Sequence, residues 1–232
     1  RRIQKLVRAG KWHIMGGWYL QPDCNMPSGE SFVRQALVGR SYFREKFGVT
    51  PTTAINFDPF GHSRGLVQIL AKSGYDSYLF CRQGQEDCDL PDGPFLWKGY
   101  DGSQVIAERA MESYLTHRGK ARGKIERLMT SSNLNPLIVL WGIGNHGGGP
   151  SRLDLQQINQ LIRKTTDAEI LHSTPQAYFR QVRRKHHTLP QYKQSLNPWA
   201  VGCYTSQVRI KQKHRELENE FFSTEKMTTA AV

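Results

Sequence analysis

The chain has 232 residues, of which 38% are hydrophobic, and this length and apolar content are enough for one sizeable core. No apolar run is long enough for a membrane span and the start, Arg1-Arg2-Ile3-Gln4, has no signal-peptide core, so we expect neither a membrane protein nor a leader. The formal net charge of +12 could indicate nucleic acid binding, but the basic stretch 118–124 has no aromatic residues for base stacking, so we expect a solvated basic face and no nucleic acid partner.

Apolar periodicity predicts an alternation of short strands and helices. In chain order we expect a helix over 1–9, a strand over 12–15, a helix over 31–47, a strand over 53–57, a helix over 63–73 and a strand over 77–81. There follow a hairpin over 95–99 and 104–107, a helix over 119–130, a strand over 137–141, a helix over 153–164, a strand over 169–172 and a helix over 175–184. This order predicts an α/β fold with a mainly parallel sheet.

The pattern changes near residue 189, where Pro190 and then Pro198 interrupt the chain. A long polar helix is expected from about Ser206 to the end, with only a partial apolar stripe that needs partners to bury it. We therefore divide the chain into residues 1–190 and residues 191–232.

The four cysteines are scattered and form no Cys-x-x-Cys pair; they are Cys24, Cys81, Cys88 and Cys203. This spacing is typical of neither a structural zinc knot nor a disulfide framework. We expect reduced thiols in a cytoplasmic protein.

The turn Asn-Phe-Asp-Pro-Phe-Gly-His at residues 56–62 places the carboxylate of Asp58 between an apolar strand and a helix. Sheets of α/β proteins carry their reactive groups at the carboxyl ends of strands, so Asp58 is a candidate catalytic residue. The alternative is that Asp58 caps the helix expected near Ser63.

The glycines Gly142, Gly144 and Gly147 match the dinucleotide fingerprint G-x-G-x-x-G between an expected strand and an expected helix. That fingerprint also requires an acidic residue at the end of the next strand, where this chain has His172 and Ser173. The sequence therefore does not favour dinucleotide binding.

Several segments, in order, resemble glycoside hydrolase family 38, the α-mannosidases, in particular those of the bacterial and cytosolic type. They are residues 16–35, the turn at Asp58, and residues 78–82, 142–150, 172–175 and 202–206. The resemblance implies an incomplete, mainly parallel (β/α) barrel of the catalytic domain over 1–190, and over 191–232 a linker and the first helix of a three-helix bundle. Because the chain lacks an initiator Met and family members are several times its length, we expect an internal fragment. Whether the full-length protein forms a homo-oligomer stays open.

The same resemblance assigns Asp58 two roles, as the nucleophile of a retaining glycosidase and as a ligand of a zinc ion that grips the sugar hydroxyls. It also assigns to Arg82 a substrate-site role in which the guanidinium pairs with the nucleophile, because a nearby opposite charge favours an ionised carboxylate. The alternative for Arg82 is a strand-end residue that faces solvent.

The loop over 142–150 resembles the family segment that carries the general acid/base. Many relatives have Asp where this chain has Asn145, and an amide cannot donate a catalytic proton at neutral pH. We therefore assign the acid/base role to His146, which titrates in the useful range, and substrate binding to Asn145. His146 as a sugar ligand or loop brace, and a carboxylate from elsewhere, stay open as alternatives.

Trp18, Asp23 and Asn25 lie in a segment that resembles family residues near the substrate. We expect the indole to face a pyranose ring and the two polar side chains to bind its hydroxyls. The alternatives are a core Trp and a turn at Pro22-Asp23. We expect His62 to brace the catalytic turn and not to bind a metal.

The family's other zinc ligands belong to a His-x-Asp pair and a Phe-His-Asp stretch, and neither pattern occurs in this sequence. Asp58 is then the only expected zinc ligand, so we expect the isolated chain to bind zinc poorly and to hydrolyse little or nothing. The sequence predicts a fragment of a zinc-dependent α-mannosidase that acts on terminal α-mannosides, in a glycan or a small mannoside. The alternative is a catalytically dead carbohydrate- or partner-binding remnant that lacks the metal ligands.

Overall fold

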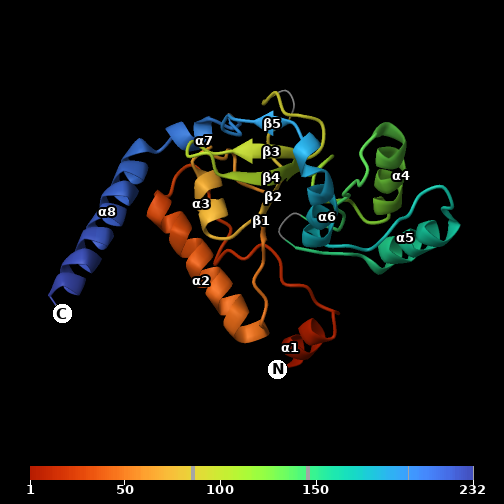
Figure 1. Ribbon diagram of the computed structural model, residues 1–232, viewed down its shortest axis with the longest axis horizontal. Coiled ribbons are helices and arrows are strands. Elements are labelled where there is room, and N and C mark those ends of the chain that lie inside the picture. The colour runs from red at the N-terminus through yellow and green to blue at the C-terminus, as the bar shows by residue number, and fades with distance from the viewer. Residues whose placement is uncertain (85–86, 145–146, 198, 232) are drawn as a thin grey trace.

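The computed structural model describes residues 1–84, 87–144, 147–197 and 199–231, which form one mixed sheet with helices on both faces (Figure 1). The strand order is β1-β2-β4-β3-β5. The strands are β1 (Thr53–Asn56), β2 (Ser77–Phe80), β3 (Phe95–Lys98), β4 (Gln104–Arg109) and β5 (Gln191–Tyr192). The hairpin β3–β4 is antiparallel, and the other three neighbouring pairs are parallel.

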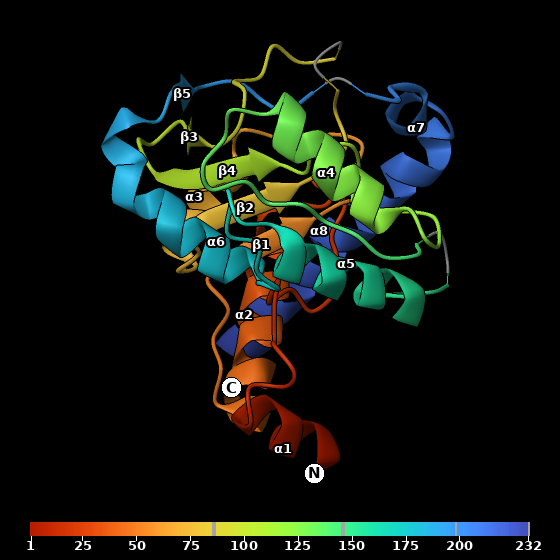
Figure 2. The same cartoon turned by 90° about the vertical axis from the view of Figure 1, so that its right-hand side faces the viewer.

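The two faces of the sheet are covered by different helices. On one face α2 (Gly29–Phe47) and α3 (Leu66–Lys72) pack against strand residues such as Tyr78 and Trp97. On the other face α6 (Pro175–Val182) packs against residues such as Leu79 (Figure 2). Because both faces are covered, every residue of β2 is buried, as expected for a parallel strand between two helical layers.

A third apolar cluster joins α4 (Ala121–Ser131) to α5 (Arg152–Lys164). The start of α4 has no capping side chain of its own. Asp154 of α5, which is fully buried, accepts hydrogen bonds from the backbone N–H of Gly119 at 3.0 Å and of Ala121 at 3.1 Å. This carboxylate satisfies amides that the helix start leaves free, and so ties α4 to α5.

Most of the predicted elements are confirmed, including the hairpin and α1 (Arg2–Arg8), but three predicted strands are wrong. Residues 12–15 and 169–172 form no strand, and Trp12 and Leu171 are exposed. Residues 137–141 do alternate between two apolar clusters, as a strand would, but they form no ladder. The carbonyl of Leu140 accepts a hydrogen bond from the side chain of Lys124 instead.

The α/β class and the mainly parallel sheet are therefore confirmed, while the sheet of the described residues is open. The closed barrel and the helical bundle stay predictions, as does the division of the chain at residue 190. No helix in the part of the chain that the structure describes is long and apolar enough to cross a membrane.

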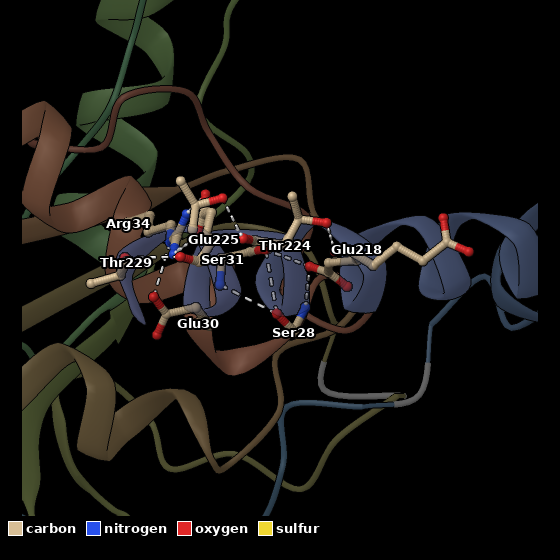
Figure 3. Close-up of polar contacts among 10 residues, drawn as sticks. Ser28, Glu30, Ser31, Arg34, Glu218, Thr224, Glu225 and Thr229 are labelled. Atoms are coloured by element: carbon tan, nitrogen blue, oxygen red, sulfur yellow. Dashed lines mark hydrogen bonds and ion pairs between the residues drawn. The ribbon is translucent and has the colours of Figure 1, made fainter. Parts of the chain in front are cut away.

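After β5 the chain passes through α7 (Gly202–Thr205) into α8 (Val208–Ala230), which has no buried residue. Polar contacts attach α8 to the start of α2 (Figure 3). Oε1 of Glu218 accepts hydrogen bonds from the N–H of Ser28, at 3.0 Å, and from the hydroxyl of Ser31. Arg34 donates to both carboxylate oxygens of Glu225, at 2.7 and 2.5 Å. These contacts, and not a buried apolar stripe, hold the long helix against the sheet domain.

Candidate active site

The turn after β1 carries Asp58 at the carboxyl end of the strand. The side chain of the last strand residue, Asn56, is fully buried and donates to Sγ of Cys24 at 2.8 Å, which anchors the strand end. The side chain of Asp58 is 48% exposed. Asp58 does not cap the next helix, because α3 begins at Leu66 after Gly65 and has no side-chain cap. The capping alternative is therefore wrong.

Two donors from neighbouring strand ends contact the Asp58 carboxylate. Arg82, after β2, donates from Nη2 to Oδ1 at 2.6 Å. The hydroxyl of Tyr114, in the loop after β4, lies 3.2 Å from Oδ1 and 3.5 Å from Oδ2. An ion pair this exposed contributes at most about 1 kcal/mol to stability. Its main effect is to orient the carboxylate and to leave Oδ2 the less engaged oxygen.

Aromatic rings surround the guanidinium of Arg82. Its Cζ lies 5.2 Å from the ring centre of Phe60 and 5.0 Å from that of Trp199, and the two rings meet edge to face at 4.8 Å. Cation–π contacts of this kind contribute about 0.5–2 kcal/mol and restrict where the guanidinium can point. We call Phe60 and Trp199 the aromatic clamp.

Tyr114 is also held by an aromatic contact. Its ring stacks on Phe57 at a centroid distance of 5.1 Å and an interplanar angle of 6°. Burial, together with the negative charge of Asp58, raises the pKa of Tyr114, so its hydroxyl stays a hydrogen-bond donor at neutral pH. Sequence reasoning missed Tyr114, although it follows the end of β4 in the same way that Asp58 and Arg82 follow β1 and β2.

His62 is the last residue of the turn that carries Asp58, and its side chain is fully buried. Its Nδ1 lies 2.6 Å from the hydroxyl of Tyr78, and its backbone exchanges hydrogen bonds of 3.0 and 2.9 Å with Leu196. Burial lowers the pKa of His62 to about 3, so the imidazole is neutral at physiological pH. These contacts match the bracing role predicted for it.

The structure places Trp18 in the core of the described residues. The indole is 7% exposed and packs on Tyr75 at a centroid distance of 5.4 Å. This burial favours the core alternative, and a sugar contact for the indole stays a prediction.

Asp23 and Asn25 form a turn, as their alternative interpretation states. Oδ1 of Asp23 accepts hydrogen bonds from the N–H of Asn25 and of Met26, both at 2.9 Å. The amide of Asn25 donates to Oδ1 of Asn197 at 3.2 Å. The hydroxyl of Tyr204 also donates to Oδ2 of Asp23 at 3.2 Å, so both side chains contact segments that are distant in sequence. Substrate contacts for Asp23 and Asn25 stay a prediction.

Asn145 and His146, the predicted substrate-binding and acid/base residues, lie outside the described residues. The stem of their loop is described: the N–H of Thr116 donates to the carbonyl of Gly142 at 2.8 Å, and that of Ile143 to Gly149 at 2.9 Å. The stem of this loop is therefore tied to the loop that carries Tyr114.

An open depression of about 290 Å³ lies between the ends of β2 and β4, next in sequence to Arg82 and Tyr114. It is lined by Cys81, Gln83, Gly84, Arg109, Ala110, Glu112 and Ser113. Gln83, Glu112 and Ser113 have positive φ angles of 72°, 53° and 82°. Strained backbone of this kind clusters at functional sites.

The residues present do not by themselves fit a zinc ion. Within the described ranges no three His, Cys, Asp or Glu side chains come together as a metal site. Asp58 offers one carboxylate, and that carboxylate is engaged by Arg82 and Tyr114. A zinc site needs three or four protein ligands, so the predicted zinc is not supported by this chain alone.

The model of the "Glycosyl hydrolases family 38 N-terminal domain" matches residues 1–200. Alpha-mannosidase G of Dictyostelium discoideum is 31% identical over 243 residues, which cover 98% of this chain and 21% of that protein. Alpha-mannosidase 2C1 of Homo sapiens is 27% identical over 243 residues, which cover 100% of this chain and 23% of that protein. The chain thus spans about a fifth of the length of the curated relatives it matches.

Two solved structures share the fold. An alpha-mannosidase from Enterococcus faecalis V583 matches with a TM-score of 0.67 and 21% identity, over 84% of this chain and 23% of that one. A 4-alpha-glucanotransferase from Thermococcus litoralis matches with a TM-score of 0.58 and 14% identity, over 98% of this chain and 37% of that one.

Proposed function

The chain belongs to glycoside hydrolase family 38, and we propose that the protein of which it is a part is a retaining α-mannosidase with Asp58 as its nucleophile. The observation that carries the proposal is the setting of Asp58. Its carboxylate is half exposed at a strand end and is oriented by Arg82 and Tyr114. The relatives that match the chain bear the name alpha-mannosidase.

In the proposed reaction the less engaged oxygen, Oδ2 of Asp58, attacks the anomeric carbon of a terminal α-mannoside. A bond forms between Oδ2 and that carbon while the glycosidic C–O bond breaks, and a general acid protonates the leaving oxygen. Water then attacks the mannosyl ester, and the same group, now a base, takes the proton of the water. Arg82 and Tyr114 keep the carboxylate aimed in the first step and stabilise it as it is released in the second.

For the acid/base we propose His146, and for a further substrate contact Asn145, on the sequence argument alone. A histidine is suited to this exchange because it can hold or release a proton near neutral pH. Asn145 would donate to a sugar hydroxyl.

We propose that further segments complete the open sheet into a barrel, that α8 begins a three-helix bundle, and that the protein is cytoplasmic. A zinc ion bound there would polarise and orient the sugar hydroxyls, with Asp58 as the one ligand from this chain. The isolated chain is then expected to bind zinc poorly and to be inactive.

The test is hydrolysis of 4-nitrophenyl α-mannoside by the full-length protein supplied with zinc. Asp58→Asn is expected to lower kcat by at least about 1,000-fold, because a neutral amide is a poor nucleophile. The control is Asp89→Asn, a carboxylate on the surface, which should keep wild-type activity.

The incomplete ligand set favours a second candidate, a carbohydrate-binding remnant without activity. Binding of the mannoside by the full-length protein with no hydrolysis, with or without zinc, would support that candidate and exclude the first.

A further inference from the structure

Helix α4 carries a lysine whose ammonium group lies inside the protein. Lys124 is 3% exposed, and its Nζ donates to the carbonyl of Ser113 at 2.6 Å and to that of Leu140 at 2.9 Å. Burial lowers the pKa of Lys124, and the nearby carboxylate of Glu112 opposes that shift. Withdrawal of an ammonium group from water is unfavourable, and charge-assisted hydrogen bonds offset that penalty in part.

The two carbonyls belong to segments that both lead to the candidate active site. Ser113 precedes Tyr114, which contacts Asp58, and Leu140 precedes the loop over 142–150. A second link joins the same segments, because the N–H of Gly142 donates a hydrogen bond to the hydroxyl of Thr116 at 3.2 Å. Lys124 and Thr116 therefore set the spacing between the two loops.

The first of these loops is strained at the point that α4 holds. Glu112 and Ser113 have φ angles of 53° and 82°, a backbone conformation that is strained in residues other than glycine. Arg127, one turn beyond Lys124 on α4, donates to both carboxylate oxygens of Glu112 at 3.0 and 2.6 Å. Two cations of one helix thus hold the two residues of the bend, and Tyr114 comes next in the chain.

We propose that Lys124 is a positioning residue for the reaction. It holds the bend at residues 112–113 so that the hydroxyl of Tyr114 reaches Asp58, and it fixes that loop relative to the segment over 140–142. Lys124 acts through Ser113 and Leu140 and does not touch Asp58. Its effect on catalysis rests on the proposed function, whereas its effect on Tyr114 does not.

The experiment compares Lys124→Met with Arg122→Met in the full-length protein. Both variants remove a cation from α4, but Arg122 is 41% exposed and pairs with Glu126 on the surface. Misplacement of a positioned group by about 1 Å costs on the order of 100-fold. We expect Lys124→Met to lower kcat by about 10- to 100-fold with KM within about threefold, and Arg122→Met to stay within about twofold of wild type.

A second measurement is amide hydrogen exchange, read by mass spectrometry on the peptide that holds residues 113–118. In the wild type the N–H of Thr116 donates to the carbonyl of Gly142 at 2.8 Å, which protects that amide from exchange. In Lys124→Met we expect this peptide to exchange about tenfold faster or more, while Arg122→Met leaves its exchange unchanged.

The outcomes separate the two proposals. If the wild-type protein hydrolyses no mannoside, the proposed function fails, and the exchange measurement still decides the role of Lys124. Unchanged exchange in Lys124→Met overturns that role, as does an unchanged kcat in an active enzyme. If Lys124→Met does not fold, the shorter but polar Lys124→Gln replaces it: faster exchange of the same peptide supports the proposal, and no change overturns it.

Discussion

Glu108 is a carboxylic acid in an apolar layer, and its removal should change how the stability of the chain depends on pH. The residue lies on β4 opposite Leu79, is 1% exposed, and accepts a hydrogen bond from the hydroxyl of Tyr178 at 2.8 Å. Burial raises its pKa from 4.5 to about 8, although Tyr178 and the charge of Arg109 oppose the shift. At neutral pH the folded protein therefore holds Glu108 mainly as the neutral acid.

The raised pKa fixes the sign and the size of the effect. The contribution of Glu108 to stability is fully present below pH 4.5 and is lost as the pH rises through about 8. Between the two pKa values the free energy of unfolding falls by about 1.36 kcal/mol for each pH unit, so the loss from pH 5 to pH 8 is about 3.5 kcal/mol. Glu108→Gln cannot ionise and keeps an acceptor for Tyr178, so it should not show this loss.

The assay is urea unfolding of wild type and Glu108→Gln at pH 5, 6.5 and 8. We expect the variant to gain about 3 kcal/mol over wild type between the lowest and the highest pH. Glu126→Gln is the control, because that side chain is 45% exposed and should leave the pH dependence unchanged. Parallel curves for wild type and Glu108→Gln would show that Glu108 ionises freely, which would contradict a raised pKa for this carboxyl.

Three further predictions concern other residues. The pKa of His62 is lowered, so its contribution to stability is present above pH 6.5 and falls by about 1.4 kcal/mol for each pH unit below that, down to about pH 3. The NMR signal of its ring proton should therefore not titrate between pH 5 and 8, and a midpoint near 6.5 would contradict this. Gly39→Ala should destabilise the chain by about 1–3 kcal/mol in urea unfolding, because a Cβ there would lie 2.3 Å from a backbone oxygen, which outweighs a gain in helix propensity of at most about 1 kcal/mol. The control Gly123→Ala, with no atom within 4 Å of the added Cβ, should instead be stabilising, and equal effects of the two would rule out the overlap. Trp199→Leu, which opens the aromatic clamp, should lower kcat/KM of the full-length protein about tenfold, and an unchanged value would show that the clamp does not orient the guanidinium.

The helices and the buried strands were predictable because their signal is local. Apolar spacing gave the positions of α2 and α5, and the apolar runs at β1 and β2 predicted those strands correctly. The segment over 137–141 shows the limit of such reasoning. Its side chains alternate between two clusters, but periodicity reports burial and not backbone pairing, and the buried ammonium of Lys124 takes a carbonyl that a strand would use.

The candidate active site was predictable in part. Asp58 and Arg82 follow adjacent strands, so their contact could be expected from the sheet alone. Trp199 could not, because it reaches Arg82 from a segment beyond residue 190 that has no regular structure to place it. The role of Trp18 could not be decided from the sequence, because an indole suits a sugar ring and a core equally well; the structure adds that the indole packs on Tyr75.

Covalent trapping of the full-length protein with a fluorinated mannoside, followed by peptide mapping, tests most directly whether Asp58 is the nucleophile. Fluorine slows hydrolysis of the glycosyl ester, so the sugar stays on the nucleophile. We expect a single labelled peptide that carries the mannosyl group on Asp58. A label on any other residue would contradict it.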